Sequence, residues 1–407
     1  MEGFRTILSA GLCLSLIACG HGPPPEYPVW SAHRLPEPPV SGSSNAFDSY
    51  AMAALDVEAR AGKYLDHVSF TPKQREVAAA LSAKGLALIE QGVHKRCDFR
   101  FEPSQPFEAP PYLRGWRLLG DEIVWQVRNA VALEDYPKAI KAAIMGAKFG
   151  FDLCGGGAVD VSLGLSIADE TRRAIAPAIA RMQTAQLGAL AEGLENALHE
   201  KPPLAAAIRN EGLNMMAAVQ YVQDAYRTGD YSELEKNLGF DTHSEIDYLK
   251  DMPRGGSERV AYFRGFAADA DDEVAWLMSQ VSHCAADRKP AKSKSPDKRP
   301  WWRFARHFFF TVRPLIACDD MTVDRTSLLI IEASIQRIVR LGKPAPTSLG
   351  EFPTWLTTDR FTGKAFIYRV DGQDFDVYSV GQDLRDDDGE TDDTFTIPDL
   401  RSESCLH

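Results

Sequence analysis

Helix signals recur along most of the chain, from about residue 46 to residue 280, and they limit the fold to a mainly helical body. A clear helix start lies at Thr71-Pro72-Lys73-Gln74. Thr71 can cap the helix, Pro72 suits its first position, and Gln74 follows the cap at the spacing of a capping box. Apolar residues then follow one helix face up to Gly92, which can end the helix in a left-handed turn. We therefore expect a helical domain over residues 46–284.

Two helices of this domain are expected over residues 116–133 and 138–149, with the link Glu134-Asp135-Tyr136-Pro137 between them. So short a link predicts antiparallel packing. The pair resembles a single tetratricopeptide-type hairpin, in which Ala139, Ala142 and Ala143 would let the helices approach closely. No repeat of about 34 residues follows. A plain helical bundle is therefore the favoured alternative.

Glycines and prolines divide the rest of the helical domain. Gly150 is expected to end the second helix of the pair, and Gly155-Gly156-Gly157 to interrupt the helical pattern rather than to bind phosphate. Further helices are expected over residues 167–199, 204–227 and 273–283.

The residues from Asp324 onward follow a different pattern. An amphipathic helix is expected over residues 326–341, followed by Gly342 and a loop that contains prolines. Two short β-rich runs, 365–370 and 375–380, flank Asp371-Gly372, and Asp-Gly between such runs is a strong hairpin signal. We therefore expect a module with a small antiparallel sheet over residues 324–398, a tail over 399–407, and an α+β fold overall.

The order of elements in this module resembles a known domain. The helix, the proline loop, Asp359-Arg360-Phe361-Thr362-Gly363-Lys364, the hairpin and Tyr378-Ser379-Val380-Gly381-Gln382-Asp383 follow one another as in the carboxyl-terminal domain of the major pseudopilins of type II secretion. The module looks closer still to uncharacterised bacterial proteins that carry it without the pilin helix. The resemblance implies the fold of the pseudopilin tip. Filament assembly is not implied, because the N-terminus lacks the hydrophobic assembly helix.

The same resemblance implies a calcium site, because the secretion pseudopilins bind calcium in the loop after the Tyr-Ser strand. The matching loop here carries Asp383, Asp386, Asp387 and Asp388. Calcium prefers hard oxygen ligands, and a divalent ion would relieve the repulsion among these carboxylates. The alternative is a solvated acidic tail without metal.

The N-terminal residues indicate export. An apolar run from Thr6 to Ala18 follows Arg5 and is too short to span a bilayer, which is typical of a signal peptide over residues 1–18. Leu16-Ile17-Ala18-Cys19 resembles the lipobox of bacterial lipoproteins. The resemblance implies cleavage between Ala18 and Cys19, lipidation of Cys19 and a membrane anchor made of several acyl chains. A plain secretory signal is the alternative.

Residues 19–45 are rich in proline and are expected to form an extended tether. Gly20 follows the lipidated cysteine, where lipoproteins retained in an inner membrane typically carry Asp. We therefore expect an outer-membrane anchor, with the folded part facing the periplasm or the cell surface.

A basic segment precedes the carboxyl-terminal module. Residues 285–300 are expected to be a linker, and residues 301–323 an aromatic connecting segment. Aromatic and basic side chains together suit a membrane interface, and the candidates are Trp301, Trp302, Arg303, Phe304 and Arg306. The favoured alternative is that the linker charges are solvated and the aromatic rings pack into the core.

Five cysteines remain after Cys13 leaves with the signal peptide and Cys19 is lipidated. None has the spacing of a zinc site, whereas an oxidising exterior permits disulfides. Cys284 and Cys318 flank the basic segment and are the candidate pair.

The net charge of −12 argues against nucleic acid as a partner. No motif for a metalloprotease, a nucleophile elbow or a phosphate loop is present. The sequence therefore favours a non-enzymatic envelope lipoprotein that binds or scaffolds another envelope protein. One alternative is an envelope hydrolase with its active site in the helical domain. Another is an accessory component of a secretion or pilus-like machine.

Overall fold

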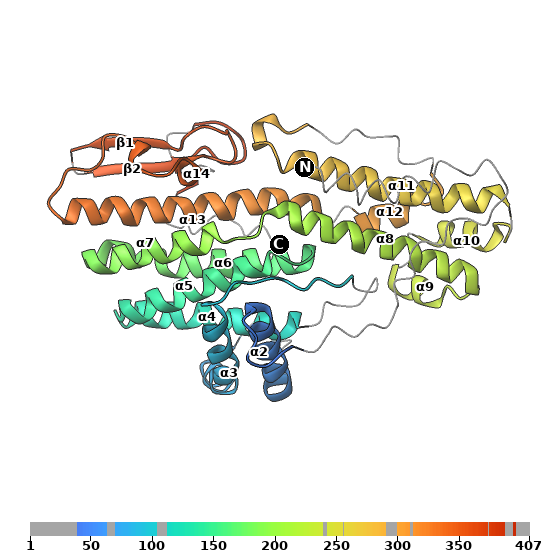
Figure 1. Cartoon of the computed structure of the whole chain (residues 1–407), viewed down its shortest axis with the longest axis horizontal. Helices are drawn as coiled ribbons and strands as arrows, with labels where there is room; N and C mark the ends of the chain where they lie inside the picture. The colour runs from blue at the N-terminus through green and yellow to red at the C-terminus, as the bar shows by residue number, and fades with distance from the viewer. Residues whose placement is uncertain are drawn as a thin grey trace.

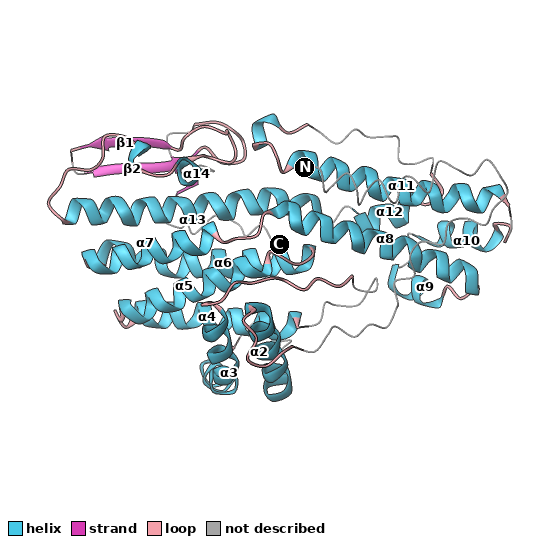
Figure 2. Ribbon diagram, viewed as in Figure 1, coloured by secondary structure: helices cyan, strands magenta, loops and turns pink. Residues whose placement is uncertain are grey.

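The computed structural model describes residues 39–62, 70–103, 112–238, 242–254, 256–289, 299–309, 312–372, 374–386 and 394–395. Helices make up most of the described chain, and a small antiparallel sheet with the strand order β1-β2-β3 lies near the carboxyl end (Figure 2). The expected α+β class is therefore confirmed at this level.

The elements follow one another along the chain as α2 (Ala46–Ala61), α3 (Pro72–Gly92), α4 (Leu113–Ala132), α5 (Tyr136–Leu153), α6 (Ala158–Ile175), the 3-10 helix η2 (Ala176–Arg181), α7 (Thr184–His199), α8 (Leu204–Thr228), α9 (Ser232–Leu238), α10 (His243–Asp251), α11 (Ser257–Gln280), η4 (Ala285–Asp287), α12 (Trp302–Phe309), α13 (Arg313–Arg340), η7 (Leu349–Glu351), α14 (Thr354–Thr357), β1 (Ile367–Asp371), β2 (Asp374–Ser379) and β3 (Thr394–Phe395).

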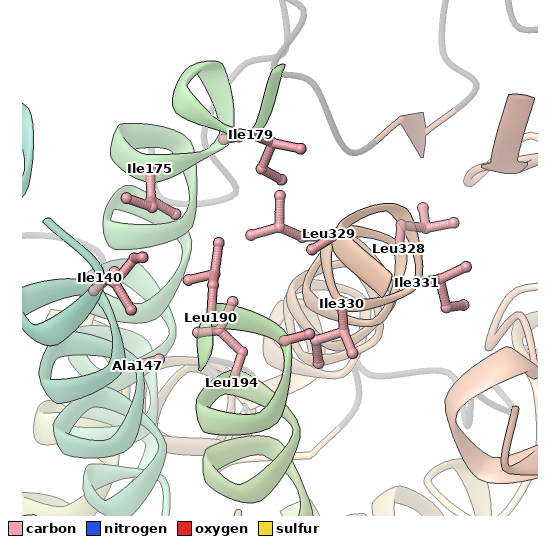
Figure 3. Close-up of a cluster of buried hydrophobic side chains, with 14 of the residues drawn as sticks. Ile140, Ala147, Ile175, Ile179, Leu190, Leu194, Leu328, Leu329, Ile330 and Ile331 are labelled. Atoms are coloured by element: carbon pink, nitrogen blue, oxygen red, sulfur yellow. The ribbon is translucent and has the colours of Figure 1, made fainter. Parts of the chain in front are cut away.

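Helices α4 to α7 and α13 are stacked beside one another, and the sheet covers the side of α13 that faces away from α7 (Figure 1). Leu190 and Leu194 of α7 lie between Ile140 of α5 and Ile330 of α13 (Figure 3). Helices α2 and α3 pack against α4, whereas α8 and α11 run away from the stack toward α9 and α10 (Figure 1).

Local sequence signals are confirmed at several helix and strand ends. The amide of Gln74 donates to Thr71 Oγ1 at 3.3 Å and the amide of Thr71 to Gln74 Oε1 at 2.9 Å, which is the expected capping box. Asp135 caps α5 by accepting from the amide of Lys138, so the α4–α5 hairpin forms as expected. Gly372 has a φ of 66° in the β1–β2 turn, and Asp371 pairs with Asp374 across it.

Three expected helix boundaries are wrong. Helix α5 continues through Gly150 to Leu153. The helix expected over residues 167–199 is two helices separated by η2, where Pro177 lacks the amide that an α-helix would need. The helix expected over 273–283 is the end of α11, which begins at Ser257.

Helix α13 also crosses the expected domain boundary at residue 324. It begins at Arg313, and its first turns contribute Leu315 and Ile316 to a hydrophobic cluster with α8 and α11. Its later residues, from Val323 to Ile335, join a different cluster with α4 to α7 and the sheet. Because α13 belongs to both clusters, the sheet is not separated from the helical body.

Helices α5 and α6 approach closely where each carries a glycine. A Cβ atom built on Gly150 would lie 2.5 Å from the carbonyl oxygen of Gly164, and one built on Gly164 would overlap the carbonyl oxygen of Gly150. The two backbones are therefore in direct contact. The residues on either side of this contact divide among all three hydrophobic clusters of the described chain, as shown by Phe149, Phe151, Cys154, Leu165, Ile167 and Ala168.

We predict that Gly164→Ala lowers the free energy of unfolding by roughly 2 to 3 kcal/mol, because the new methyl group forces α5 and α6 apart. Gly62→Ala is the matched control, since a Cβ at the end of α2 meets nothing within 4 Å. Urea unfolding followed by circular dichroism measures both variants. Equal stability of the two would contradict the close contact.

Candidate functional site

Buried charged side chains gather where the end of α5, the start of α6 and the first part of α8 meet. We call this group the polar junction, and it consists of Tyr50, Lys148, Asp152, Asp160, Glu200, Asn210, Glu211 and Asn214. Lys148, Asp152, Asp160 and Glu211 are buried. Buried charges are unfavourable unless they are paired and hydrogen-bonded, so each needs a partner here.

The first half of the polar junction is built around Lys148. Its Nζ atom lies 2.5 Å from Asp152 Oδ1, one helical turn later on α5, and 3.2 Å from Glu200 Oε2 at the end of α7. Tyr50 of α2 donates its hydroxyl to Asp152 Oδ2 at 2.7 Å. Burial alone would lower the pKa of Lys148, but the charges of Asp152 and Glu200 outweigh it and raise that pKa. The lysine is therefore a fixed positive charge that links α2, α5 and α7.

The second half holds the start of α6. Asp160 Oδ2 accepts from the amide of Gly157 at 2.9 Å, and Glu211 Oε2 accepts from the amide of Ala158 at 3.0 Å. The first amides of a helix have no partner within the helix, and negative groups there are favourable. Asn214 also donates to Glu211, and Asn210 donates to the carbonyl oxygens of Gly155 and Gly156. Helix α8 thus holds both the turn at Gly155–Gly157 and the start of α6.

Asp160 is the most perturbed member of this half. Burial raises the pKa of Asp160 to about 7, and the nearby Glu211 adds to the increase, against the opposing effect of the Gly157 amide. Burial also raises the pKa of Glu211. Asp160 Oδ1 has no hydrogen-bond partner among the residues that the structure describes. A buried carboxyl of this kind is protonated for part of the time near neutral pH.

Two carboxyl groups with raised pKa values are the groups that general acid–base chemistry uses. Here each of them accepts a backbone amide of α6, which makes its position part of the fold. Asp160 therefore stabilises the start of its own helix, and Glu211 joins α8 to α6.

The expected calcium loop is only partly described. Asp383 Oδ1 accepts from the amide of Arg385, whereas Asp386 accepts from the Tyr378 hydroxyl at 2.9 Å and lies 3.4 Å from Arg369. Asp387 and Asp388 lie outside the described residues. Within the described part of the chain, no group of three or more His, Cys, Asp or Glu side chains is arranged to hold a metal ion.

The aromatic connecting segment packs against α11. Phe304 is fully buried, and the Trp301 ring covers Gly265 and donates from Nε1 to Asp269 at 2.7 Å. This packing buries Phe304, which the membrane-interface expectation placed at the surface, whereas Trp301 is half-buried. Arg303 lies 3.3 Å from Glu245, Trp302 is half-buried and Arg306 is exposed. Of the linker, Arg288 pairs with Asp320 at 2.5 Å, whereas residues 290–298 lie outside the described part.

Cys284 and Cys318 do not form the expected disulfide. The Cys284 thiol donates to Asp287 Oδ2 at 3.3 Å, beside the turn at Gly363. Cys318 is buried on α13 within the cluster that includes α8 and α11. Sequence spacing alone does not reveal these surroundings.

The expected anchor residues, Ala18 and Cys19, and the expected tether up to residue 38 lie outside the described residues. Among the described helices, none is both long enough and apolar enough to cross a membrane.

The sequence did not identify the residues of the polar junction. Lys148 and Asp152 are four positions apart, and this spacing could have indicated a pair on one helix face. Asp160 and Glu211 lie in separate helices, so no local signal joins them. Only the break at Gly155–Gly157, where α8 holds the turn, was expected and is confirmed.

Comparisons with known proteins give no assignment. No protein-family model, no curated protein and no solved structure matches the chain.

We predict that Asp160→Asn reduces the pH dependence of stability. Because the pKa of Asp160 is raised on folding, the native state binds the proton more tightly than the unfolded chain does. Stability from this group is therefore greatest below about pH 4 and decreases as the pH rises to about 7. The asparagine has no charge to bury and can still accept from Gly157, so the variant gains a few kcal/mol relative to wild type over this range.

Thermal unfolding between about pH 4 and about pH 8 measures the difference. Asp135→Asn is the control, because it also removes a carboxylate from a helix start, but from an exposed one. A constant difference in melting temperature between Asp160→Asn and wild type across this range would contradict the prediction.

Proposed function

We propose that the chain is an exported lipoprotein, anchored through Cys19, whose helical body binds or scaffolds another envelope protein. The anchor rests on the resemblance of Leu16–Cys19 to a lipobox and on the proline-rich residues that follow. Gly20 after the lipidated cysteine favours the outer membrane. The body would stand away from the lipid surface on its tether and face the periplasm or the cell surface.

The observation that supports the binding role is that buried charged side chains hold helices together. Lys148 and Asp152 of α5 are bonded to each other, to Glu200 at the end of α7 and to Tyr50 of α2, whereas Asp160 and Glu211 are bonded to the start of α6. Such pairing joins α2, α5 and α7 at one point and α6 and α8 at another. A body whose helices are fixed in this way offers a preorganised surface, which lowers the cost of ordering on binding.

The hydrolase alternative has one specific observation in its favour, the buried carboxyl pair Asp160 and Glu211. Their bonds to the amides of Gly157 and Ala158 favour the binding role over it. The secretion or pilus-machine alternative rests on the resemblance of residues 324–398 to the pseudopilin tip, and on fold analogy alone. The order of α13, a proline loop and a small antiparallel sheet is compatible with that resemblance.

The proposal predicts that the wild-type protein fractionates with membranes and captures a specific envelope protein. Cys19→Ala keeps the body but loses the lipid, so it should leave the membrane fraction. A second control carries residues 1–45 on an inert soluble protein, which separates capture by the body from effects of the anchor. A photo-crosslinking residue placed in turn at the exposed positions Leu133, Leu341 and Trp355 maps the face that is used.

Capture of the same proteins by the anchor control, or of none by wild type, would contradict the binding role. Mass spectrometry that finds an intact initiator methionine would contradict the anchor. Turnover of an envelope polymer that is lost in both Asp160→Asn and Glu211→Gln would favour the hydrolase alternative.

We also propose calcium as a ligand of the loop with Asp383, Asp386, Asp387 and Asp388. Millimolar calcium should raise the melting temperature of the full chain, because ligand that binds only the native state stabilises it. Asp383→Asn combined with Asp386→Asn should remove the effect, whereas Asp376→Asn, on the exposed side of β2, should keep it. Calorimetric titration that shows no heat with the wild type would rule out the site.

A further inference from the structure

Two carboxyl groups hold the turn at residues 359–363, which precedes β1 and is bonded to α13 beside the apolar contact between α13 and the sheet. Asp359 Oδ1 accepts from the amides of Phe361 and Thr362 at 2.7 and 3.4 Å. Asp324 of α13 accepts from the amide of Arg360 through Oδ2 at 2.9 Å. One carboxyl group therefore shapes the turn and the other docks it. We call Asp324, Asp359 and this turn the carboxyl latch.

Asp324 is unusual because one of its two carboxyl oxygen atoms has no hydrogen bond. It is fully buried, and its Oδ1 atom lacks a hydrogen-bond partner among the described residues. The Nε atom of Arg360 lies 3.9 Å away, which is beyond hydrogen-bond distance. Burial raises the pKa of Asp324 well above its ordinary value, and the negative charge of Asp359 raises it further.

The other charged groups near the carboxyl latch are engaged elsewhere. On α13, Asp320 pairs with Arg288 at 2.5 Å, and Asp319 pairs with Lys201 from the α7–α8 link at 2.5 Å. Arg325 lies 3.8 Å from Asp169 of α6. Asp287 accepts from the Cys284 thiol beside the turn. Arg360 is thus the cation that faces Asp324, and it is half exposed.

We propose that a proton on Oδ1 of Asp324 keeps the turn docked on α13, so that the sheet is held in mild acid and loosens as the pH rises. With the proton in place, one of two neighbouring buried carboxyl groups is neutral, and the backbone bonds to both are kept. When the proton leaves to solvent, two negative charges face each other beside the same turn. Undocking then relieves the repulsion by letting water reach both carboxylates. The sheet would therefore respond to pH independently of any partner.

Hydrogen exchange of the full chain, followed by mass spectrometry, tests this proposal between about pH 5 and about pH 9. The labelling time at each pH is adjusted to compensate for the intrinsic pH dependence of the amide exchange rate. The protection of amides in residues 357–366 should fall by up to about tenfold per pH unit where opening releases one proton. Protection that stays constant after scaling would overturn the proposal.

Asp324→Asn supplies the decisive comparison. Its amide oxygen can accept from Arg360, and its NH2 group replaces the proton, so protection of residues 357–366 should no longer depend on pH. Asp376→Asn removes an exposed carboxylate from the same sheet and should respond as wild type does. A pH response of Asp324→Asn equal to that of wild type would overturn the proposal.

Asp359→Asn provides a second route if Asp324→Asn does not fold. It keeps an acceptor for the amides of Phe361 and Thr362 but removes the second negative charge. Protection should then begin to fall at a lower pH than in wild type, because the neighbouring negative charge is gone. That pH should still lie above the ordinary pKa of an Asp side chain, because Asp324 remains buried. An unchanged onset would show that Asp359 does not act on Asp324 and would also overturn the proposal.

Discussion

The direct contact of α5 and α6 at Gly150 and Gly164 is the constraint on which the rest of the structure depends. Because neither residue has a side chain, the two backbones meet there. The neighbouring residues pack into three different hydrophobic clusters. Each of the three hydrophobic clusters takes apolar residues from this hairpin or its turn. The hairpin is therefore the element that α2 and α3, the sheet with α13, and the α8–α12 part all contact.

The polar junction lies at the end of the same hairpin and adds specificity to it. Apolar packing alone tolerates small shifts between helices, whereas paired buried charges do not, since a displaced partner leaves a charge unpaired. Lys148 ties α5 to α7, and Glu211 ties α8 to α6. A body fixed in this way is compatible with the proposed binding role, because binding would then require little reordering of the helices.

Sequence patterns predicted those features that depend on neighbours in the chain. The capping box at Thr71, the break at Gly155–Gly157 and the Asp371-Gly372 turn form through local backbone chemistry. The start of α13 was missed because its residues face two clusters, so no single apolar stripe marks the helix. The pair of Asp160 and Glu211 was missed because its members meet only after α8 folds back on α6. Gly150 was read as a helix end, although its role is a contact with α6.

Native-state hydrogen exchange in increasing denaturant tests the central role of the α5–α6 hairpin most directly. If the hairpin joins the three clusters, its amides are the last to exchange, and protection in α8, α11 and α13 disappears together with theirs at the same denaturant concentration. Protection that persists in α8 and α11 after the amides of α5 and α6 have exchanged would contradict this account, because that part would then be stable without the hairpin.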